Sequence, residues 1–487
     1  MKTKPIRFAA IALACLMLLA LLAGCKKEAG DSQQTTPPAN NGQGEQNDGY
    51  LPDSLPDDLN FDEDVTILYW TDTGMPEFDV EASGDLVDDA IFNRNQSVQE
   101  RLNITLNWTG ANQEQFAQTV QNDRNGEEKI DIIAGYSQTM ATVTYTGNTI
   151  DLIGVNYLDF TKPWWPDSLL NEAMVGDKLY FISGDISTNT LYWMYATFFN
   201  KTMLQTYGLE DPYTLVANNE WTVDKMFSMC KEIYTDAGEP GKDLADTFGI
   251  VMPRLSIDAF FYSSGLRTTE KGDNGELLLS PSYTGEVSQR LAEMLVELLF
   301  DSEGGFCVHD DTGPVNQAFA NGQVAFITNR PMDAITDYGH ANNLVYGVVP
   351  TPKWDSQQEQ YLTCIGNPFT LYSISMAQSY DQERVDMLGA VLECMASEAY
   401  RKTTPALYEQ TMQTRYAKDD VTAQMYDICR ENIVFDLGRI FGATMNNLTQ
   451  TKYRGLIESG SSAWQVEAQK FTVELEMYLN LIYEALG

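Results

Sequence analysis

The sequence predicts an α/β fold made of more than one domain, and three observations support this prediction. The chain has 487 residues, enough for two or three domains at roughly 100–200 residues each. Hydrophobic residues make up 43% and charged residues 21%, which is typical of a globular protein. After residue 62, short β-branched and aromatic runs alternate with segments of helical periodicity, an order that predicts a parallel sheet covered by helices.

The first predicted elements follow one another as strand, helix, strand, helix and strand. Residues 65–70 are a β-branched and aromatic run, which predicts a buried strand. Over residues 85–101, apolar side chains recur at helical spacing, with acidic residues in the first turns. Residues 104–108 alternate with a period of two, 113–122 form a helical stretch, and 130–134 are a third apolar run. Right-handed crossovers are expected between these strands.

Residues that follow these strands are candidates for a binding site, because ligands bind beyond the carboxyl ends of parallel strands. This rule selects Trp70 and Asp72 after the first strand, Trp108 after the second and Tyr136 after the third. Core packing is the alternative for each aromatic side chain, and it is the preferred interpretation for Trp108.

The composition excludes several classes of function. With 69 acidic residues against 31 Lys and Arg, the formal net charge is −38, so phosphate backbones and anionic lipids repel the chain and nucleic-acid binding is excluded. His309 and His340 are the two histidines, which leaves little room for histidine-based catalysis or a histidine-rich metal site. No GxGxxG, GxxxxGKS/T, GxSxG or HExxH motif accompanies the predicted strands. We therefore expect no enzymatic activity, no cofactor and no metal.

The first 61 residues predict how the protein reaches its location. A basic start and an apolar stretch over residues 8–23 have the layout of a secretory signal. The sequence Leu-Ala-Gly-Cys that ends at Cys25 resembles the bacterial lipobox, in which the signal is removed before the cysteine and the thiol carries a lipid. We therefore predict a signal peptide over 1–24, and a lipidated Cys25 followed by a flexible polar tether over 25–61. An ordinary cleaved signal or an N-terminal membrane anchor is the alternative.

The remaining cysteines do not suggest a disulfide framework. They are odd in number, and no two of them are closely spaced, so buried free thiols are expected: Cys230, Cys307, Cys364, Cys394 and Cys429.

Motifs along residues 64–487 resemble one protein family. They are LDFTKPWW at 158–165, GDKLY at 176–180, GD at 184–185, TFFNK at 197–201, YGL at 207–209, DPY at 211–213, WT at 221–222, AFANGQVAF at 318–326, GVVPTPK at 347–353 and QY at 360–361. In this order and spacing they resemble the extracellular solute-binding proteins of ABC sugar importers (family 1, the maltodextrin-binding type).

The resemblance implies a two-lobed, periplasmic-binding-protein-like fold of type II, with hinge strands and a ligand cleft. By position, we place the hinge crossings near residues 192–199 and 350–364. The implied lobes are 62–192 plus 362–405 for lobe 1, and 193–361 plus 406–487 for lobe 2. Homologues often have a calcium-like loop where this chain has residues 236–243, but Ala, Gly, Pro and Lys interrupt the oxygen ligands there.

A carbohydrate would need flat apolar surfaces for its ring faces and oriented polar groups for its hydroxyls. The candidate ligand-binding residues have these properties, and Asp436 and Arg439 belong to a family-like segment: Trp70, Asp72, Tyr136, Asp185, Trp193, Asn329, Arg330, Trp354, Asp436 and Arg439. Trp164 and Trp165, next to two prolines, are expected to lie in a packed surface loop and not to contact ligand. Trp464 begins an apolar stripe of helical spacing that is expected to join the core.

The function that these features imply is that of a monomeric, lipid-anchored receptor on the outer face of the cell membrane. It would capture a carbohydrate, an oligosaccharide, by closing its two lobes, and deliver it to the permease subunits of an ABC transporter. A peptide or another polar solute in the same cleft is an alternative, as is a glycan-binding surface protein without a permease. A glycosidase that uses two carboxylates comes last.

Overall fold

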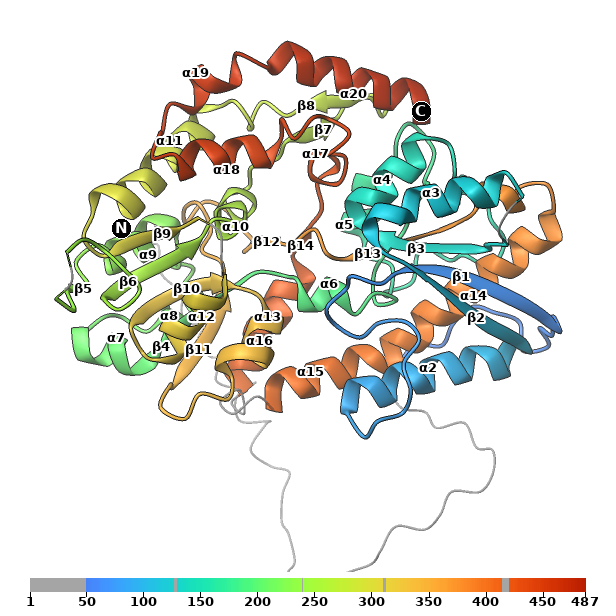
Figure 1. Ribbon diagram of the computed structural model, residues 1–487, viewed down its shortest axis with the longest axis horizontal. Helices are drawn as coiled ribbons and strands as arrows, with labels where there is room; N and C mark the ends of the chain where they lie inside the picture. Colours follow the sequence, from blue (N-terminus) through green and yellow to red (C-terminus); the bar gives the residue numbers. More distant parts are fainter. Residues whose placement is uncertain (1–49, 127–128, 239, 310–311, 414–419) are drawn as a thin grey trace, which may run out of the picture. The chain divides into compact units, whose positions relative to one another are not determined.

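The computed structural model describes residues 50–487 apart from 127–128, 239, 310–311 and 414–419 (Figure 1). The predicted signal peptide, Cys25 and the tether up to residue 49 lie outside the described residues. Leu51–Gly487 forms one compact unit. This unit begins within the segment predicted as tether: Asp53 forms an ion pair with Arg101 (3.1 Å), and the Leu55 side chain is buried.

The first sheet has the strand order β13-β3-β1-β2, with parallel pairing of β1 to both β2 and β3 and antiparallel pairing of β13 to β3. Its strands are β1 (Glu63–Trp70), β2 (Ile104–Ala111), β3 (Ile132–Tyr136) and β13 (Thr370–Ile374). The three strands predicted from the first part of the chain are therefore parallel neighbours. β13 comes from more than 200 residues further along the chain, so this sheet is discontinuous in sequence, with residues 370–374 beside 132–136.

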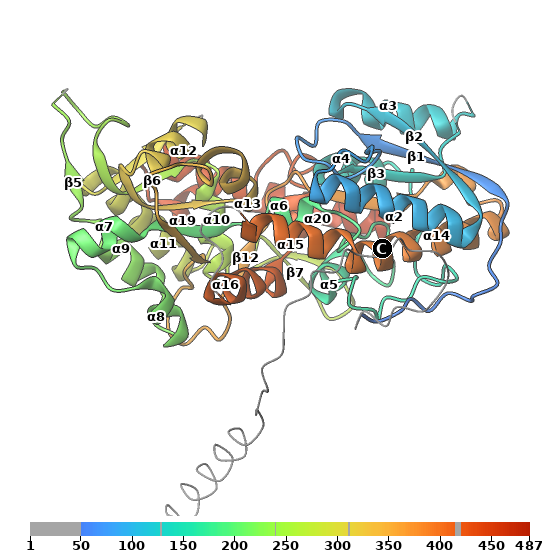
Figure 2. The same ribbon diagram turned by 90° about the horizontal axis from the view of Figure 1, so that it is seen from below.

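Helices join and cover these strands. Asp85 caps the first of them, because its carboxylate accepts from the backbone N–H groups of Val87 and Asp88. In Figure 2, α2 lies beside α14 and α15, and both of these helices pack against it. The helices around the first sheet are α2 (Leu86–Leu102), α3 (Gln113–Arg124), α4 (Ser137–Tyr145), α5 (Asp167–Ala173), α6 (Asn189–Tyr192), α14 (Gln382–Arg401) and α15 (Thr403–Gln413).

The second sheet has the order β11-β4-β10-β6-β5, and β9 pairs with β6 as a branch. β10 is parallel to β6 and antiparallel to β4. The strands are β4 (Ala196–Asn200), β5 (Tyr234–Thr235), β6 (Thr247–Pro253), β9 (Gly305–Val308), β10 (Val324–Asn329) and β11 (Tyr346–Pro350). The helices that accompany this sheet are α7 (Lys201–Tyr207), α8 (Pro212–Ala217), α9 (Val223–Cys230), α10 (Ser256–Ser263), α11 (Glu286–Val296), α12 (Thr312–Ala320), α13 (Pro331–Asp333) and α16 (Asp420–Glu431).

The segments that lead from one sheet to the other run side by side. The backbone N–H of Tyr195 donates to the carbonyl of Cys364 (2.8 Å), and that of Gly366 donates to the carbonyl of Trp193 (2.8 Å). β12 (Thr363–Cys364) also pairs in parallel with β14 (Ile433–Val434). Trp193, Tyr195 and Cys364 lie within the ranges 192–199 and 350–364, where the sequence analysis placed the hinge crossings, and Gly366 lies just beyond the second range.

The last part of the chain contacts elements of both sheets. Its elements are α17 (Leu437–Ile440), α18 (Gln450–Glu458), α19 (Trp464–Ala468) and α20 (Thr472–Leu486), and it lies next to the hairpin β7 (Thr269–Lys271) and β8 (Leu277–Leu279). The Tyr180 hydroxyl donates to the carbonyl of Leu486 (3.0 Å), so residues assigned to lobe 2 touch residues of lobe 1. The stripe that begins at Trp464 is buried, as predicted.

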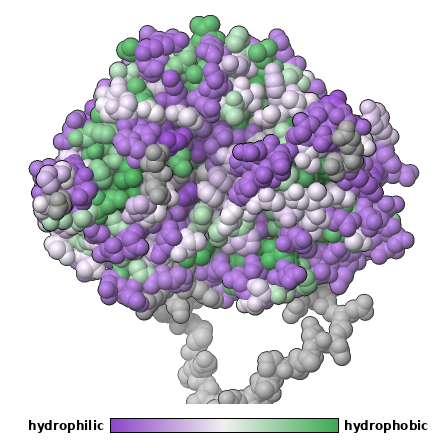
Figure 3. All heavy atoms as spheres, in the orientation of Figure 1, coloured by the Kyte–Doolittle hydropathy of each residue, from purple (hydrophilic) through white to green (hydrophobic). Residues whose placement is uncertain are grey.

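The surface is mostly hydrophilic on the face drawn in Figure 3, with smaller hydrophobic patches. The five cysteines from Cys230 to Cys429 are buried free thiols, as predicted. Among the described residues, none of the helices is both long and apolar enough to cross a membrane.

Candidate functional site

Two predicted aromatic residues meet at the carboxyl edge of the first sheet. Trp70 ends β1, and its indole N–H donates to the hydroxyl of Thr370 (2.9 Å). Tyr136 ends β3, and the centroids of its ring and the Trp70 ring are 5.5 Å apart. Trp70 is 1% exposed, whereas Tyr136 is half-buried, so Tyr136 is the more accessible of the two. Burial raises the pKa of the Tyr136 hydroxyl, which keeps it a neutral donor.

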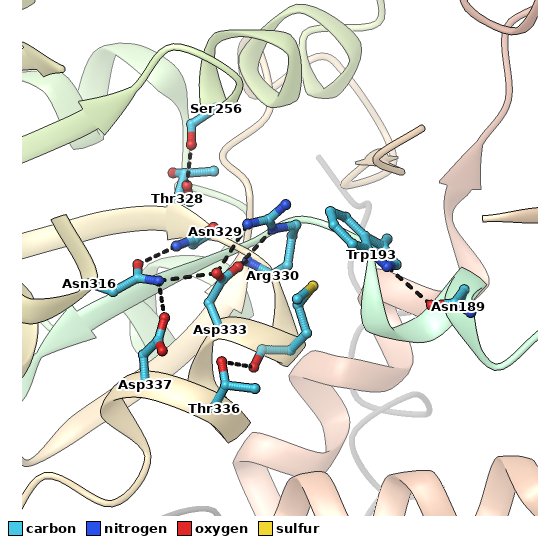
Figure 4. A network of polar contacts seen from close by, with 11 residues as sticks. Asn189, Trp193, Ser256, Asn316, Thr328, Asn329, Arg330, Asp333, Thr336 and Asp337 are labelled. Atoms are coloured by element: carbon cyan, nitrogen blue, oxygen red, sulfur yellow. Dashed lines mark hydrogen bonds and ion pairs between the residues drawn. The ribbon is translucent and has the colours of Figure 1, made fainter. Parts of the chain in front are cut away.

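Trp193 and Arg330 meet between the two sheets. Trp193 follows α6 in the crossing segment, and Arg330 follows the last residue of β10. Figure 4 shows them side by side, with the Arg330 guanidinium carbon 4.5 Å from the centroid of the Trp193 ring system. Asp333 holds the guanidinium in a two-point ion pair, with distances of 2.7 and 3.0 Å. This contact links a residue of the second sheet to the crossing segment.

Glu77, a buried residue that the sequence analysis missed, supports the orientation of Trp193 through Asn189. The Trp193 indole N–H donates to the side-chain carbonyl of Asn189 (3.1 Å). The amide NH₂ of Asn189 donates to Glu77, which is 1% exposed and also accepts from the hydroxyl of Tyr372 (2.8 Å). Burial raises the pKa of Glu77. Glu77 lies in an irregular loop, so no periodicity or motif could have identified it.

Arg439 extends the site on the side of the second sheet. Its Nη1 pairs with Asp258 Oδ2 (3.0 Å), and its Nε donates to Oδ1 of Asn367 (2.6 Å). Its backbone carbonyl accepts from the side chain of Gln138, which lies just after Tyr136 (3.3 Å). Next to Asn367, Gly366 passes so close to Trp193 that a Cβ there would lie 3.1 Å from the indole ring. The structure therefore brings five of the predicted residues into one region: Trp70, Tyr136, Trp193, Arg330 and Arg439.

Three predicted residues support the structure around this region. Asn329 is buried, and its amide donates to Asn316 (2.6 Å), which in turn donates to Asp333. The Asp436 carboxylate accepts from the backbone N–H of Thr268 (2.6 Å) and from the hydroxyl of Thr269. Asp72 is exposed and accepts from the backbone N–H of Gln113, where α3 begins (2.8 Å).

Two others lie apart from this group. Asp185 pairs with Arg430 (2.9 Å) and accepts from the Thr404 hydroxyl (2.6 Å). It borders a separate cavity of about 560 Å³ that is also lined by Pro163, Tyr400 and Phe435. Trp354 is half-buried, and its backbone N–H donates to the side chain of Gln358 (3.1 Å). In the described part of the chain, no hydrogen bond, ion pair or ring contact joins either residue to Trp193.

The described residues of the loop around 236–243 are held by hydrogen bonds to a carboxylate and from a lysine. The carboxylate of Asp246 accepts from the backbone N–H groups of Ala237 (2.8 Å) and Asp243 (3.1 Å). The ammonium of Lys242 donates to the carbonyls of Ser302 and Gly305. Over the residues that the structure describes, no group of three or more His, Cys, Asp or Glu side chains is placed to hold a metal.

Comparisons with known proteins give one family and one fold. The model of the family described as "Bacterial extracellular solute-binding protein" matches residues 93–377, more than half of the chain. No curated protein sequence matches at a significant level.

Solved structures share the fold at low identity. A sugar transporter of Rhizobium etli, in an open conformation, has a TM-score of 0.54 at 13% identity, over 85% of this chain and 99% of that one. The maltose/maltodextrin-binding domain of Bdellovibrio bacteriovorus bound to maltotriose has a TM-score of 0.52 at 13% identity, over 86% and 100%. The ABC substrate-binding protein of Listeria monocytogenes in complex with cycloalternan has a TM-score of 0.52 at 12% identity, over 84% and 98%. The predicted two-lobed α/β fold is confirmed.

Proposed function

Because this chain belongs to the family of bacterial extracellular solute-binding proteins, we propose that it captures an oligosaccharide between its lobes and delivers it to an ABC permease. In this proposal the protein is a monomer that a lipid on Cys25 attaches to the outer face of the cell membrane. The family is one of binding proteins, so the captured solute leaves unmodified.

The observation that carries the proposal is the convergence of aromatic and polar side chains from both lobes. Trp193 and Tyr136 offer ring surface that is half-buried, and Asn367 and Arg439 offer fixed polar groups beside it. Sugar rings have apolar C–H faces and polar rims, so a site of this kind suits them. The solved structures from Bdellovibrio and Listeria, which share this fold, hold maltotriose and cycloalternan.

We expect lobe closure because the proposed ligand-binding groups come from both lobes. Arg330 extends from the second sheet, whereas Tyr136 ends a strand of the first. A ligand that touches both residues stabilises the closed form by its differential affinity for that form. The hydrogen-bonded crossing segments at Tyr195 and Gly366 are the expected hinge.

The test is a thermal-shift and calorimetric screen of the purified chain against neutral and charged oligosaccharides, with a peptide library in parallel. We expect one oligosaccharide class to raise the melting temperature and to reduce the radius of gyration in solution scattering. Stabilisation by peptides alone would favour the peptide-binding alternative. Saturating ligand without compaction would contradict lobe closure.

Anchoring and delivery need separate tests in the cell. Cys25→Ala is expected to release the protein from the membrane fraction, while ligand affinity stays unchanged. Deletion of the genes for the partner permease should abolish uptake of the ligand. Uptake that persists in that deletion strain would favour a glycan-binding surface protein that works without a permease.

A further inference from the structure

Arg439, in the proposed binding region, and Arg454 share one carboxylate oxygen. Arg439 Nη1 lies 3.0 Å from Asp258 Oδ2, and Arg454 Nη1 lies 2.5 Å from the same atom. The side chains of Arg439 and Arg454 are each 8% exposed, and that of Asp258 is 1% exposed. Three nearly buried charged groups therefore carry a net charge of +1.

No other carboxylate balances this charge by an ion pair among the described residues. The second oxygen of Asp258 is buried without a partner. The Nε of Arg439 donates to the neutral amide of Asn367. The carboxylate of Asp436, three residues before Arg439, accepts hydrogen bonds from Thr268 and Thr269 and forms no ion pair with Arg439 or Arg454. The side chain of Arg454 contacts Asp258 and no other described residue by a hydrogen bond or ion pair.

Several other arginines form ion pairs with acids, although the buried Arg94 donates to Asn95 and to two backbone carbonyls and forms no ion pair among the described residues. Among the described residues, Arg330 is the one basic side chain paired with Asp333, and Arg384 is paired with both Asp131 and Glu63. In a chain with 69 acidic and 31 basic residues, an acid is the expected neighbour of any base. A surplus of buried positive charge is unfavourable unless a counter-charge reaches it.

The unbalanced charge lies beside the residues proposed to bind sugar. Arg439 donates a hydrogen bond to Asn367, and the neighbouring Gly366 lies against Trp193. The backbone carbonyl of Arg439 also accepts from Gln138, which lies close to Tyr136 in the sequence. A guanidinium has five N–H donors in a planar fork that matches a carboxylate. One donor of Arg454 and two of Arg439 are used, so donors remain for an anion.

We propose that the ligand is an acidic oligosaccharide, and that Arg439 and Arg454 bind the carboxylate of one of its sugar units. This inference rests on the proposed function and specifies its substrate class. The net charge of −38 repels an anion at long range, so recognition has to come from short, desolvated contacts. Two nearly buried guanidinium groups with one carboxylate between them provide such contacts.

The first experiment compares sodium glucuronate, glucose and sodium acetate as probes in thermal-shift titrations of the full chain at one ionic strength. Glucuronate is expected to raise the melting temperature in a saturable way, and more than either of the others. Equal stabilisation by acetate would mean an anion site without sugar recognition, and would overturn the proposal. Equal stabilisation by glucose, or none by glucuronate, would also overturn it.

The second experiment uses Arg454→Gln, with Arg384→Gln as the matched control. Arg454→Gln leaves Asp258 paired with Arg439, so the melting temperature without ligand is expected to stay the same or to rise. Its affinity for glucuronate should fall by about 10- to 100-fold, as for a lost hydrogen bond to a charged group. Arg384→Gln should lower the melting temperature and leave glucuronate affinity unchanged. Unchanged glucuronate affinity in Arg454→Gln would overturn the assignment.

The two proposals fail in distinguishable ways. If a neutral oligosaccharide such as maltotriose binds wild type and Arg454→Gln equally and compacts both, the sugar-binding function stands and the acidic class is wrong. If no sugar of either kind binds while a peptide does, the proposed function itself is wrong.

Discussion

Trp164 and Trp165 differ from Trp193 in the burial of the ring and in the partner of the indole N–H. The first two are 0% and 2% exposed, and both indole N–H groups donate to the carboxylate of Glu393, at 3.2 and 2.8 Å. Trp193 is half-buried, donates to Asn189 and lies against the guanidinium of Arg330. The comparison teaches that the partner of the indole N–H and the burial of the ring separate these two structural tryptophans from the one proposed to bind ligand.

The strongest test of this contrast is Trp165→Ala. The substitution leaves a large cavity and removes a hydrogen bond to Glu393, so the free energy of unfolding should fall by about 3–5 kcal/mol. Chemical denaturation measures this loss, and Trp165→Phe separates the hydrogen bond from the cavity. Ligand affinity of the folded fraction should not change. A loss of affinity with normal stability would place Trp165 in the binding site.

Glu393, which accepts hydrogen bonds from Trp164 and Trp165, makes the stability of the protein depend on pH. Burial raises the pKa of this carboxyl from 4.5 to about 7, although the indole N–H groups oppose the rise. The folded chain therefore holds a proton that the unfolded chain releases between those values. Its contribution to stability is present below about pH 4.5 and is lost as the pH rises through about 7, by up to about 3 kcal/mol.

Glu393→Gln should remove this part of the pH dependence. Unfolding free energies at several pH values between 4 and 8 measure the slope for both proteins, and Asp72→Asn, an exposed change elsewhere in the lobe, is the control. An unchanged slope in Glu393→Gln would contradict the assignment.

Trp193→Ala should affect binding more than stability. Loss of an aromatic anchor weakens binding by about 1–3 kcal/mol, which corresponds to roughly 5- to 150-fold in affinity. Isothermal titration with the ligand found in the screen measures this, and Trp193→Phe should recover part of the affinity. If Trp193→Ala destabilises the chain as much as Trp165→Ala and binds normally, the distinction between the two regions is wrong.

Thr370→Val is the substitution with the smallest expected effect. This change removes the acceptor of the Trp70 indole N–H, and an unsatisfied buried donor lowers stability by about 1–3 kcal/mol. The exposure of Trp70 resembles that of Trp165, so we expect the effect on stability and little effect on affinity. A larger effect on binding would place Trp70 with Trp193 and not with the buried pair.

The sequence predicted those parts of the fold and the site that depend on local pattern. Asp85 caps the predicted helix, the runs around residues 65–70 and 104–108 are neighbouring parallel strands, and the stripe from Trp464 is buried. The rule that ligands bind at the carboxyl ends of strands selected Trp70 and Tyr136, which are in contact. The same rule selected Asp72, but its carboxylate holds the start of α3.

The polar contacts of ionisable side chains with residues far away in the sequence depended on the tertiary structure alone. Asp185 meets Arg430 and Thr404, Glu393 meets two tryptophans more than 200 residues earlier, and Arg454 meets Asp258 nearly 200 residues earlier. Periodicity and helix capping depend on a few neighbouring residues, and composition needs no structure. All three can therefore be recognised from the sequence alone. Which charges face one another is decided only when both lobes pack, because that packing sets the distances and the burial on which their interaction depends.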